Sequence, residues 1–192
     1  MGQVGRIPKE RRQRDVSKAA SRVAILDAAR RVATRDGARD MSLRGVAAEA
    51  GFAPAALYGY FSSKDDLLLA LAADDLTSLA RAMRGTGGLA GAGAAALGLL
   101  SGAETMAAAS AALPGAGGGD AERLFNGRLI AALKALSDAS GMPSDSRESQ
   151  CDVVLVAASL AGLALLARSG RLEALGFTPD EMIARLDARF GS

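Results

Sequence analysis

The sequence predicts an all-α protein, in which an N-terminal three-helix unit precedes a larger helical bundle. Apolar residues recur at the three- and four-residue spacing of helices, as they do at Ile25, Ala28, Ala29, Val32 and Ala33. Glycine, proline and serine stand where such helices should begin or end. No segment shows the alternating pattern of a strand. At 192 residues, the chain is long enough for one sizeable domain or two small ones.

Helix start and stop signals are clearest near the N-terminus. A first helix is expected over about 18–36, because Gly37 then provides a residue that tolerates the left-handed conformation at a helix end. Ser42 can cap a short second helix, which Gly51 ends. The inner face of this second helix is expected to consist of Leu43, Val46, Ala47 and Ala50.

A third and a fourth helix are expected after the turn at Gly51. Pro54 suits the first position of the third helix. Ser63 and Asp66 form a capping pair for the fourth helix, which is expected to run to about Arg84. The residues after the turn that are expected to face the core of the first two helices are Leu57 and Phe61.

The rest of the chain is expected to be helical between glycine-rich breaks. These breaks are residues 85–93 and 114–119, which surround an alanine-rich stretch. Helices are expected over residues 120–140, 152–167 and 179–190. The last of them carries an apolar stripe of Met182, Ile183 and Leu186.

Composition excludes several classes of enzyme. The sequence has no histidine, which removes the commonest metal ligand, the commonest general base and the Ser-His-Asp triad. We therefore expect no catalytic residues, no metal and no cofactor. The single cysteine, Cys151, is expected in the core. Because cysteine pairs and a signal peptide are absent, the sequence predicts a soluble cytoplasmic protein without membrane contact.

Charge is distributed unevenly along the chain. The formal net charge is +2, but residues 1–65 carry 13 Lys and Arg against 7 Asp and Glu, and the remainder carries 10 against 14. A positive excess at one end is typical of a segment that binds a polyanion, although a solvated basic face has the same composition.

The second and third predicted helices have the dimensions of a helix-turn-helix. Two short helices joined by a turn of three or four residues, with the second helix exposed, form the unit that places a helix in the major groove of DNA. Ala47 leaves room where the two helices cross, and Gly51 opens the turn. This spacing predicts a DNA-binding unit.

Residues 25–71 resemble the DNA-binding region of the TetR family of transcriptional regulators. They read ILDAARRVATRDGARDMSLRGVAAEAGFAPAALYGYFSSKDDLLLAL. The residues that carry the resemblance are Ala47, Gly51, Leu57, Tyr58, Phe61 and Lys64. It implies a helix-turn-helix domain over residues 18–65 and a helical effector-binding and dimerisation domain over 66–192. It also implies a homodimer that binds double-stranded DNA, as a ligand-responsive repressor of a palindromic operator.

The resemblance assigns DNA contacts to individual residues. Tyr58 and Lys64 would clamp phosphates, and Ser42 would do so from the N-terminus of the second helix, where capping alone is an equal explanation. Base reading would rest on Arg44 and Tyr60. Along the third helix small residues replace the polar side chains usual in the family, so contacts with thymine methyl groups and DNA shape must contribute. These small residues are Ala53, Ala55, Ala56 and Gly59.

Other residues near the N-terminus have competing interpretations. Phe52 and Phe61 are expected in the core of the unit rather than on DNA. Residues 1–17 read as a flexible basic arm. Its arginines are expected either to enter a narrow minor groove or to serve only as a solubilising tail. The arginines concerned are Arg11, Arg12 and Arg14.

An apolar run over residues 153–167 is shorter than the roughly 20 residues of a membrane span. It predicts a helix buried nearly all round, in which Ala158 and Gly162 allow another helix to approach closely. The resemblance places a dimer interface in residues 148–168 and 179–190. Packing within one chain is the alternative.

The resemblance also implies an effector pocket in the C-terminal domain. Because that domain has no Trp, Tyr or His, a small apolar effector is the class that it could hold. The residues expected to line the pocket, each of which could equally be ordinary core, are Met83, Met106, Leu124, Phe125, Leu129 and Leu133.

Two rival functions stay open at this point. Gly91, Gly93 and Ala96 match the phosphate-binding turn G-x-G-x-x-A of nucleotide-binding enzymes, but that turn requires a preceding strand. A helical protein-interaction or scaffold module with non-specific DNA affinity would also carry a basic end. The scaffold function does not explain why Gly51 and Tyr58 occur together in a helix-turn-helix pattern.

Overall fold

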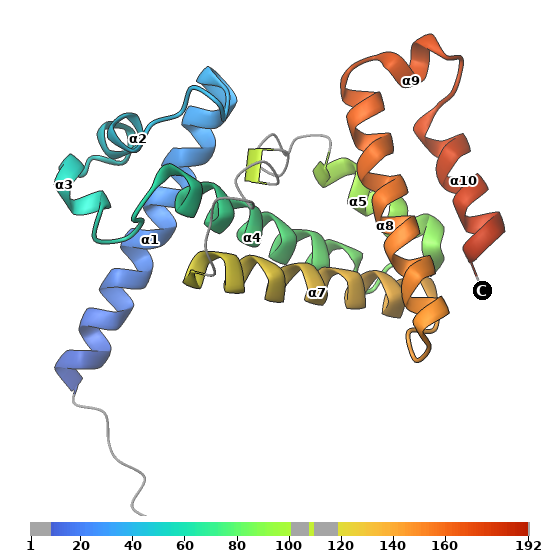
Figure 1. The fold of residues 1–192 in the computed structure, drawn as a ribbon, viewed down its shortest axis with the longest axis horizontal. Helices are drawn as coiled ribbons and strands as arrows, with labels where there is room; N and C mark the ends of the chain where they lie inside the picture. The colour runs from blue at the N-terminus through green and yellow to red at the C-terminus, as the bar shows by residue number, and fades with distance from the viewer. Residues whose placement is uncertain (1–8, 101–107, 110–118, 192) are drawn as a thin grey trace, which may run out of the picture.

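The computed structural model describes residues 9–100, 108–109 and 119–191, and every regular element in this part of the chain is a helix. The predicted all-α fold class is therefore confirmed. Figure 1 shows a small head joined by one long helix to a larger body. The head consists of α1 (Lys9–Asp36), α2 (Leu43–Ala50) and α3 (Pro54–Leu57), and the connecting helix is α4 (Lys64–Met83).

The first helix begins earlier than the apolar pattern predicts. Residues 9–17, expected to be part of a flexible arm, form the first turns of α1. They are rich in Lys, Glu, Arg and Gln, which favour helix without needing a core. The apolar pattern misses them because α1 extends beyond the head here (Figure 1), and Val16 and Val23 are exposed. The rest of the predicted arm, residues 1–8, lies outside the described residues.

The core of the head confirms the predicted helix signals. Gly51 adopts the left-handed conformation, with φ of 72°, and ends α2. The N–H of Phe52 then donates to the carbonyl of Ala47 at 2.9 Å, which fixes the turn into α3. Residues of α1, α2, α3 and the segment after α3 meet in one core, which includes Ile25, Val32, Val46, Leu57 and Phe61.

The connecting helix α4 belongs to the cores of both parts. Its N-terminus is capped as predicted, because Ser63 Oγ accepts the N–H of Asp66 at 3.0 Å. Leu67 and Leu71 are buried near the head, and Leu76 is buried near the body. Since α4 runs without a break from the head into the body, the predicted domain boundary at residue 65 stays a prediction.

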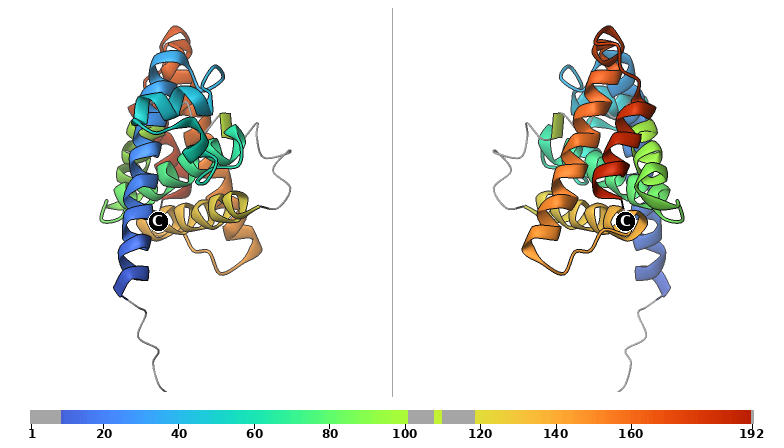
Figure 2. Two further views of the ribbon diagram at one scale, coloured as in Figure 1. Left: turned by 90° about the vertical axis from the view of Figure 1, so that its left-hand side faces the viewer. Right: turned by 90° about the vertical axis from the view of Figure 1, so that its right-hand side faces the viewer.

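The body packs around the second half of α4. Its helix α7 lies beside α4, and α8 and α10 lie side by side on the surface farthest from the head (Figures 1 and 2). The helices of the body are α5 (Gly88–Leu100), α7 (Asp120–Ser140), α8 (Arg147–Arg168), the short α9 (Arg171–Ala174) and α10 (Pro179–Phe190).

The glycine-rich stretch after α4 is helical, where a break was expected. Residues 88–93 form the first half of α5, so the prediction of a break over 85–93 is wrong for most of its length. The reason is packing: Gly93 is buried, and a Cβ atom there would lie 3.2 Å from Cγ2 of Ile183 in α10. Glycine lets the helices approach closely. The other expected break lies outside the described residues except for Gly119.

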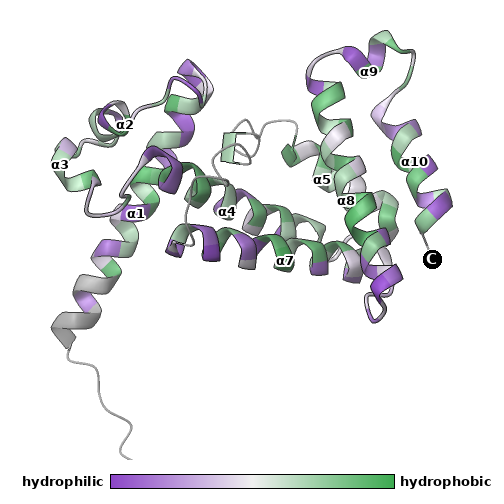
Figure 3. Cartoon of the chain, in the orientation of Figure 1, coloured by the Kyte–Doolittle hydropathy of each residue, from purple (hydrophilic) through white to green (hydrophobic). Residues whose placement is uncertain are grey.

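The apolar helix α8 is buried on one side only. Val153, Val156 and Leu160 face the body, whereas Leu155 and Leu165 are more than half exposed. The expectation of a helix buried nearly all round is therefore wrong for a single chain. Figure 3 shows that α8 is apolar over most of its length, after hydrophilic first turns. The single cysteine lies on this helix and is exposed, contrary to the expectation of a core residue.

Candidate nucleic-acid interface

The helix-turn-helix presents its predicted contact residues at the surface. Ser42 is exposed and caps α2, because its Oγ accepts the N–H of Gly45 at 3.1 Å. A hydroxyl that accepts in this way still has its proton to donate, so capping and a phosphate contact are compatible. Arg44, in the first turn of α2, is exposed.

The exposed side of the third helix consists mainly of small residues. Leu57 is fully buried, and the small residues in and beside α3 that are predicted to meet the bases are exposed. Tyr58, directly after α3, is 63 % exposed, and its hydroxyl is the only side-chain polar group among residues 53–59. The exposed small residues are Ala53, Ala55, Ala56 and Gly59.

The aromatic residues of the head divide between core and surface. Phe61 is buried, as predicted, and the guanidinium of Arg22 lies 5.1 Å from the centre of its ring. Tyr60 is half-buried, because its ring packs edge-on against Phe52 with 6.4 Å between ring centres. Phe52 is itself half-buried and not fully in the core. Tyr60 is therefore anchored by packing, whereas Tyr58 is not.

Lys64 connects the start of α4 to the turn before α2. Its Nζ donates to the backbone carbonyl of Arg39. An ammonium group has three protons to donate, so two are left for an anion. Arg39 is exposed and lies near Ser42 in the sequence. Sequence reasoning missed Arg39, although its position between two signals of helix ends pointed to an exposed turn.

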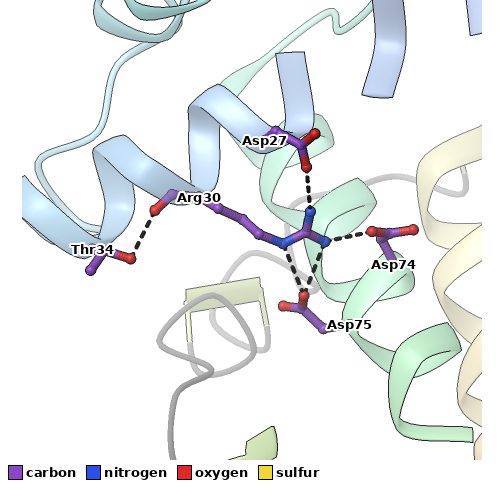
Figure 4. A network of polar contacts seen from close by, with 5 residues as sticks. All are labelled: Asp27, Arg30, Thr34, Asp74 and Asp75. Atoms are coloured by element: carbon purple, nitrogen blue, oxygen red, sulfur yellow. Dashed lines mark hydrogen bonds and ion pairs between the residues drawn. The ribbon is translucent and has the colours of Figure 1, made fainter. Parts of the chain in front are cut away.

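Three arginines of α1 stabilise the head by ion pairs. Arg30 reaches from α1 toward α4 (Figure 4), where it donates to Asp74 at 2.5 Å and to Asp75 at 3.2 Å. It also donates to Asp27 one turn away at 3.2 Å. Partial burial opposes its charge, but the hydrogen bond to Asp74 and the attraction of Asp75 outweigh burial and raise the pKa of Arg30.

The other two arginines tie α1 to α2. Arg31 donates to one oxygen of Glu49 at 2.8 Å, and Arg35 donates to the other at 3.1 Å. These hydrogen bonds lower the pKa of Glu49. Part of the positive charge counted in the N-terminal region thus pairs within the head and is not directed at a partner.

The body contains a small apolar cavity between α4, α5, α7 and α8. Its volume is about 130 Å³. Three of the predicted pocket residues line it, namely Met83, Leu129 and Leu133. Phe125 is buried outside this lining, Leu124 is partly exposed, and Met106 lies outside the described residues. Leu76 and Leu79 of α4 form one wall, so the cavity touches the helix that leads to the head.

Other kinds of site find little support in the described residues. In this part of the chain, no group of three or more Cys, Asp or Glu is placed to hold a metal ion. The stretch from Gly91 to Ala96 lies inside α5 and not after a strand, so it lacks the context of a nucleotide-binding turn. Among the described helices, α8 alone is long and apolar enough to span a membrane.

Comparisons with known proteins agree with this architecture. The family model of bacterial regulatory proteins of the tetR family matches residues 25–71, which include α2, α3 and the start of α4. None of the curated proteins compared with the sequence matches it significantly.

Several solved structures are similar over most of the chain. A TetR transcriptional regulator from Rhodococcus sp. RHA1 is 20 % identical, with a TM-score of 0.70 over 91 % of this chain and 97 % of its own. A TetR-family transcriptional regulator from Streptomyces coelicolor is 20 % identical, with a TM-score of 0.60 over 88 % and 99 %. The transcriptional regulator FadR from Bacillus subtilis, in complex with stearoyl-CoA, is 16 % identical, with a TM-score of 0.59 over 88 % and 97 %.

Proposed function

We propose that this chain, which carries a TetR-family DNA-binding region and has the fold of TetR-family regulators, is a ligand-responsive repressor that binds a palindromic operator as a dimer. The observation that carries the proposal is the helix-turn-helix itself. Its core residues are buried and its turn is fixed by Gly51, while Ser42, Arg44 and Tyr58 are exposed and Lys64 is half-buried.

Phosphate contacts are proposed for residues on both sides of the turn. Ser42 and Lys64 each keep a free donor proton after their internal hydrogen bonds, and Tyr58 is exposed. Arg39 and Arg44 supply exposed cations close to Ser42 in the sequence. We propose that Ser42, Arg39, Tyr58 and Lys64 hold the sugar-phosphate backbone on the two sides of the groove that α3 enters. Arg44 is proposed to read a base edge.

Base reading is proposed to depend on little direct hydrogen bonding. Ala53, Ala55 and Ala56 offer methyl groups to thymine, and Gly59 offers no side chain. Tyr60 is held by Phe52 and contributes mainly to the shape of the surface. Deformation of the DNA must then supply part of the specificity.

A minor-groove role is also proposed for Arg11, Arg12 and Arg14. They belong to the part of α1 that extends beyond the head, where a basic segment could follow the DNA. Deletion of residues 1–16 should weaken operator binding and reduce its salt dependence. Unchanged affinity and salt dependence would show that this segment only solubilises the protein.

Dimerisation is proposed through the outer face of α8, together with α10. The exposed apolar residues Leu155 and Leu165 flank the small residues Ala158 and Gly162, and a Cβ atom on Gly162 would meet nothing within 4 Å. An exposed apolar helix face of this kind marks a partner surface. A two-fold dimer would hold two copies of α3 about 34 Å apart, one turn of DNA.

Regulation is proposed to act through α4. Leu76 and Leu79 line the apolar cavity, and residues at the other end of α4 belong to the core of the head. A ligand that fills the cavity would favour one position of α4 and thereby change the spacing of the two heads. The cavity accepts a small apolar effector or the apolar part of a larger one. We place the protein in the cytoplasm, where its operator is.

The experiment that tests the proposal selects binding sites from a random pool of DNA duplexes. Fluorescence anisotropy of the selected site, at several salt concentrations, then gives the affinity and the number of neutralised phosphates, since each neutralised phosphate contributes about 0.9 to the slope of log affinity against log salt concentration. A palindromic site with a steep slope is expected. Tyr58→Phe and Lys64→Gln should each lower the affinity about tenfold. Equal binding to scrambled DNA would contradict the proposal and favour a scaffold protein.

A further inference from the structure

A second hollow lies on the outside of the body, between α7 and the start of α8. Its volume is about 590 Å³, and it is open to solvent. Leu133 lines both this groove and the inner cavity of about 130 Å³. One leucine side chain therefore forms a common wall between the two hollows. Together they reach the size range of pockets for small organic ligands, which is roughly 300–1,000 Å³.

The two hollows differ in polarity. The inner cavity is lined only by Leu, Met and Ala side chains. The outer groove has one apolar wall, with Ile130, Val154 and Leu155, and one polar wall that includes Lys134 and Arg147. Because Leu155 also belongs to the proposed dimer face, the groove lies at the edge of that face. No carboxylate lines the groove. A molecule that occupied both hollows would need an apolar end inside and a polar end outside.

Most polar groups of the outer groove already have partners. Lys134 is paired with Asp138, with Nζ–Oδ distances of 2.9 and 3.0 Å. Gln150 donates to the carbonyl of Ser144 at 3.2 Å. Within the described part of the chain, Arg147 is the cation of the groove without an ion pair to a side chain. Its guanidinium is thus the group most available to a ligand.

We propose that the groove and the cavity form one site for an anionic amphiphile, namely a monocarboxylate with an unbranched hydrocarbon chain. The carboxylate pairs with Arg147, and the chain passes Leu133 into the inner cavity. A hollow of about 130 Å³ with an apolar lining has room for about six carbon atoms, so a chain of about ten carbons leaves several more for the passage from the groove. This inference rests on the proposed function, since it gives the chemical class of the effector.

The test measures direct binding by calorimetry with the full-length protein and no DNA. The probes are decanoate, decan-1-ol and decyltrimethylammonium, each below its micelle concentration. Decanoate should bind at least tenfold more tightly than the alcohol or the cation. Arg147→Gln should abolish this preference by weakening decanoate about tenfold. Arg128→Gln, which removes an exposed arginine of α7 outside the groove, should change nothing.

The role of the inner cavity is tested by filling it. Ala157→Leu adds three carbons at a residue that lines the cavity on α8, and Leu133→Trp blocks the common wall. Either variant should weaken decanoate binding about tenfold. Acetate, which has no chain to insert, should show no measurable binding to the wild type or to either variant. Circular dichroism shows whether each variant is folded. If Leu133→Trp does not fold, Ala157→Leu alone provides the test.

Several outcomes would overturn the inference. These are equal binding of decanoate and decan-1-ol, tighter binding of the cation, or no binding of any probe. A shift from dimer to monomer on Arg147→Gln would show instead that a second copy covers the groove. Failure of the repressor proposal is recognised separately, because the wild-type protein would then bind no specific DNA while its decanoate binding is unchanged.

Discussion

Arg30 of α1 and Asp74 of α4 lie 2.5 Å apart, between Nη2 and Oδ2, and this contact joins the head to the helix that enters the body. Asp75 accepts from the same guanidinium, and the next residue along the chain, Leu76, lines the inner cavity. The ion pairs of the head and the first residue of the cavity wall therefore lie within one turn of α4. If α4 moves as a rigid helix, a displacement of this wall also displaces Asp74 and Asp75 and therefore changes their contacts with Arg30.

Arg30→Met is expected to loosen the head from α4. The substitution keeps an apolar stem but removes the hydrogen bonds that Arg30 donates to Asp74 and Asp75, so the free energy of unfolding should fall by about 1–2 kcal/mol. Operator affinity should fall as well, because the heads are held less firmly. Arg31→Met removes an ion pair within the head and is the control. If both variants bind operator equally, Arg30 has no special role in positioning the head.

Gly162→Arg is expected to separate the dimer and leave each chain folded. Because a Cβ atom at Gly162 meets nothing within 4 Å in one chain, the arginine fits there and gains about 1 kcal/mol in helix propensity. On the proposed interface, however, it prevents the close approach of the partner helix. Sedimentation velocity should show a monomer, with loss of operator binding. Gly127→Arg, at an equally open and exposed site of α7, should stay dimeric.

The head was predictable from the sequence because its signals are local. Gly51 ends α2, Pro54 begins α3, and the cap at Ser63 begins α4 where the pattern indicates. The site residues at the surface followed from the same pattern, since a buried Leu57 requires its neighbours on α3 to face outward.

The body was harder to predict because its helices depend on distant contacts. At Gly88–Leu100, the glycines oppose a helix although the alanines and leucines favour one, and packing against the neighbouring helices of the body, α10 among them, offsets the cost of the glycines. The exposure of Cys151 and Leu165 was likewise missed, because an apolar helix has the same sequence whether its own chain or a partner covers it. The ion pairs of Arg30 join residues far apart in the sequence and leave no local pattern.

Acid should weaken the contact between α1 and α2 through Glu49. The hydrogen bonds from Arg31 and Arg35 lower its pKa in the folded protein below the value of 4.5 expected when unfolded. Its ion pairs therefore stabilise the fold above about pH 4.5, and this contribution is lost as the pH falls through the lowered pKa. The difference in Tm between wild type and Glu49→Gln should shrink over that range. Asp145→Asn, in the exposed loop before α8, should give no such convergence.

Two glycines of α5 should respond in opposite ways to substitution. At Gly93, a Cβ atom would lie 3.2 Å from Ile183 and 3.4 Å from Leu160, so a larger side chain forces α5 away from α8 and α10. At Gly98, it would meet nothing within 4 Å, and the residue is exposed. Gly93→Leu should lower the free energy of unfolding by about 1–3 kcal/mol through overpacking. Gly98→Ala should raise it by up to about 1 kcal/mol through helix propensity.

Urea unfolding followed by circular dichroism measures both changes. Helix propensity alone predicts that both substitutions stabilise α5, whereas close packing predicts opposite signs. Gly93→Ala is the intermediate case, because the Ile183 and Leu160 side chains need to shift by only a few tenths of an ångström, so it should fall between the two. If Gly93→Leu were as stable as wild type, α5 would not be held against α10 as the structure shows, and the wall that α5 gives the inner cavity would have to be reconsidered.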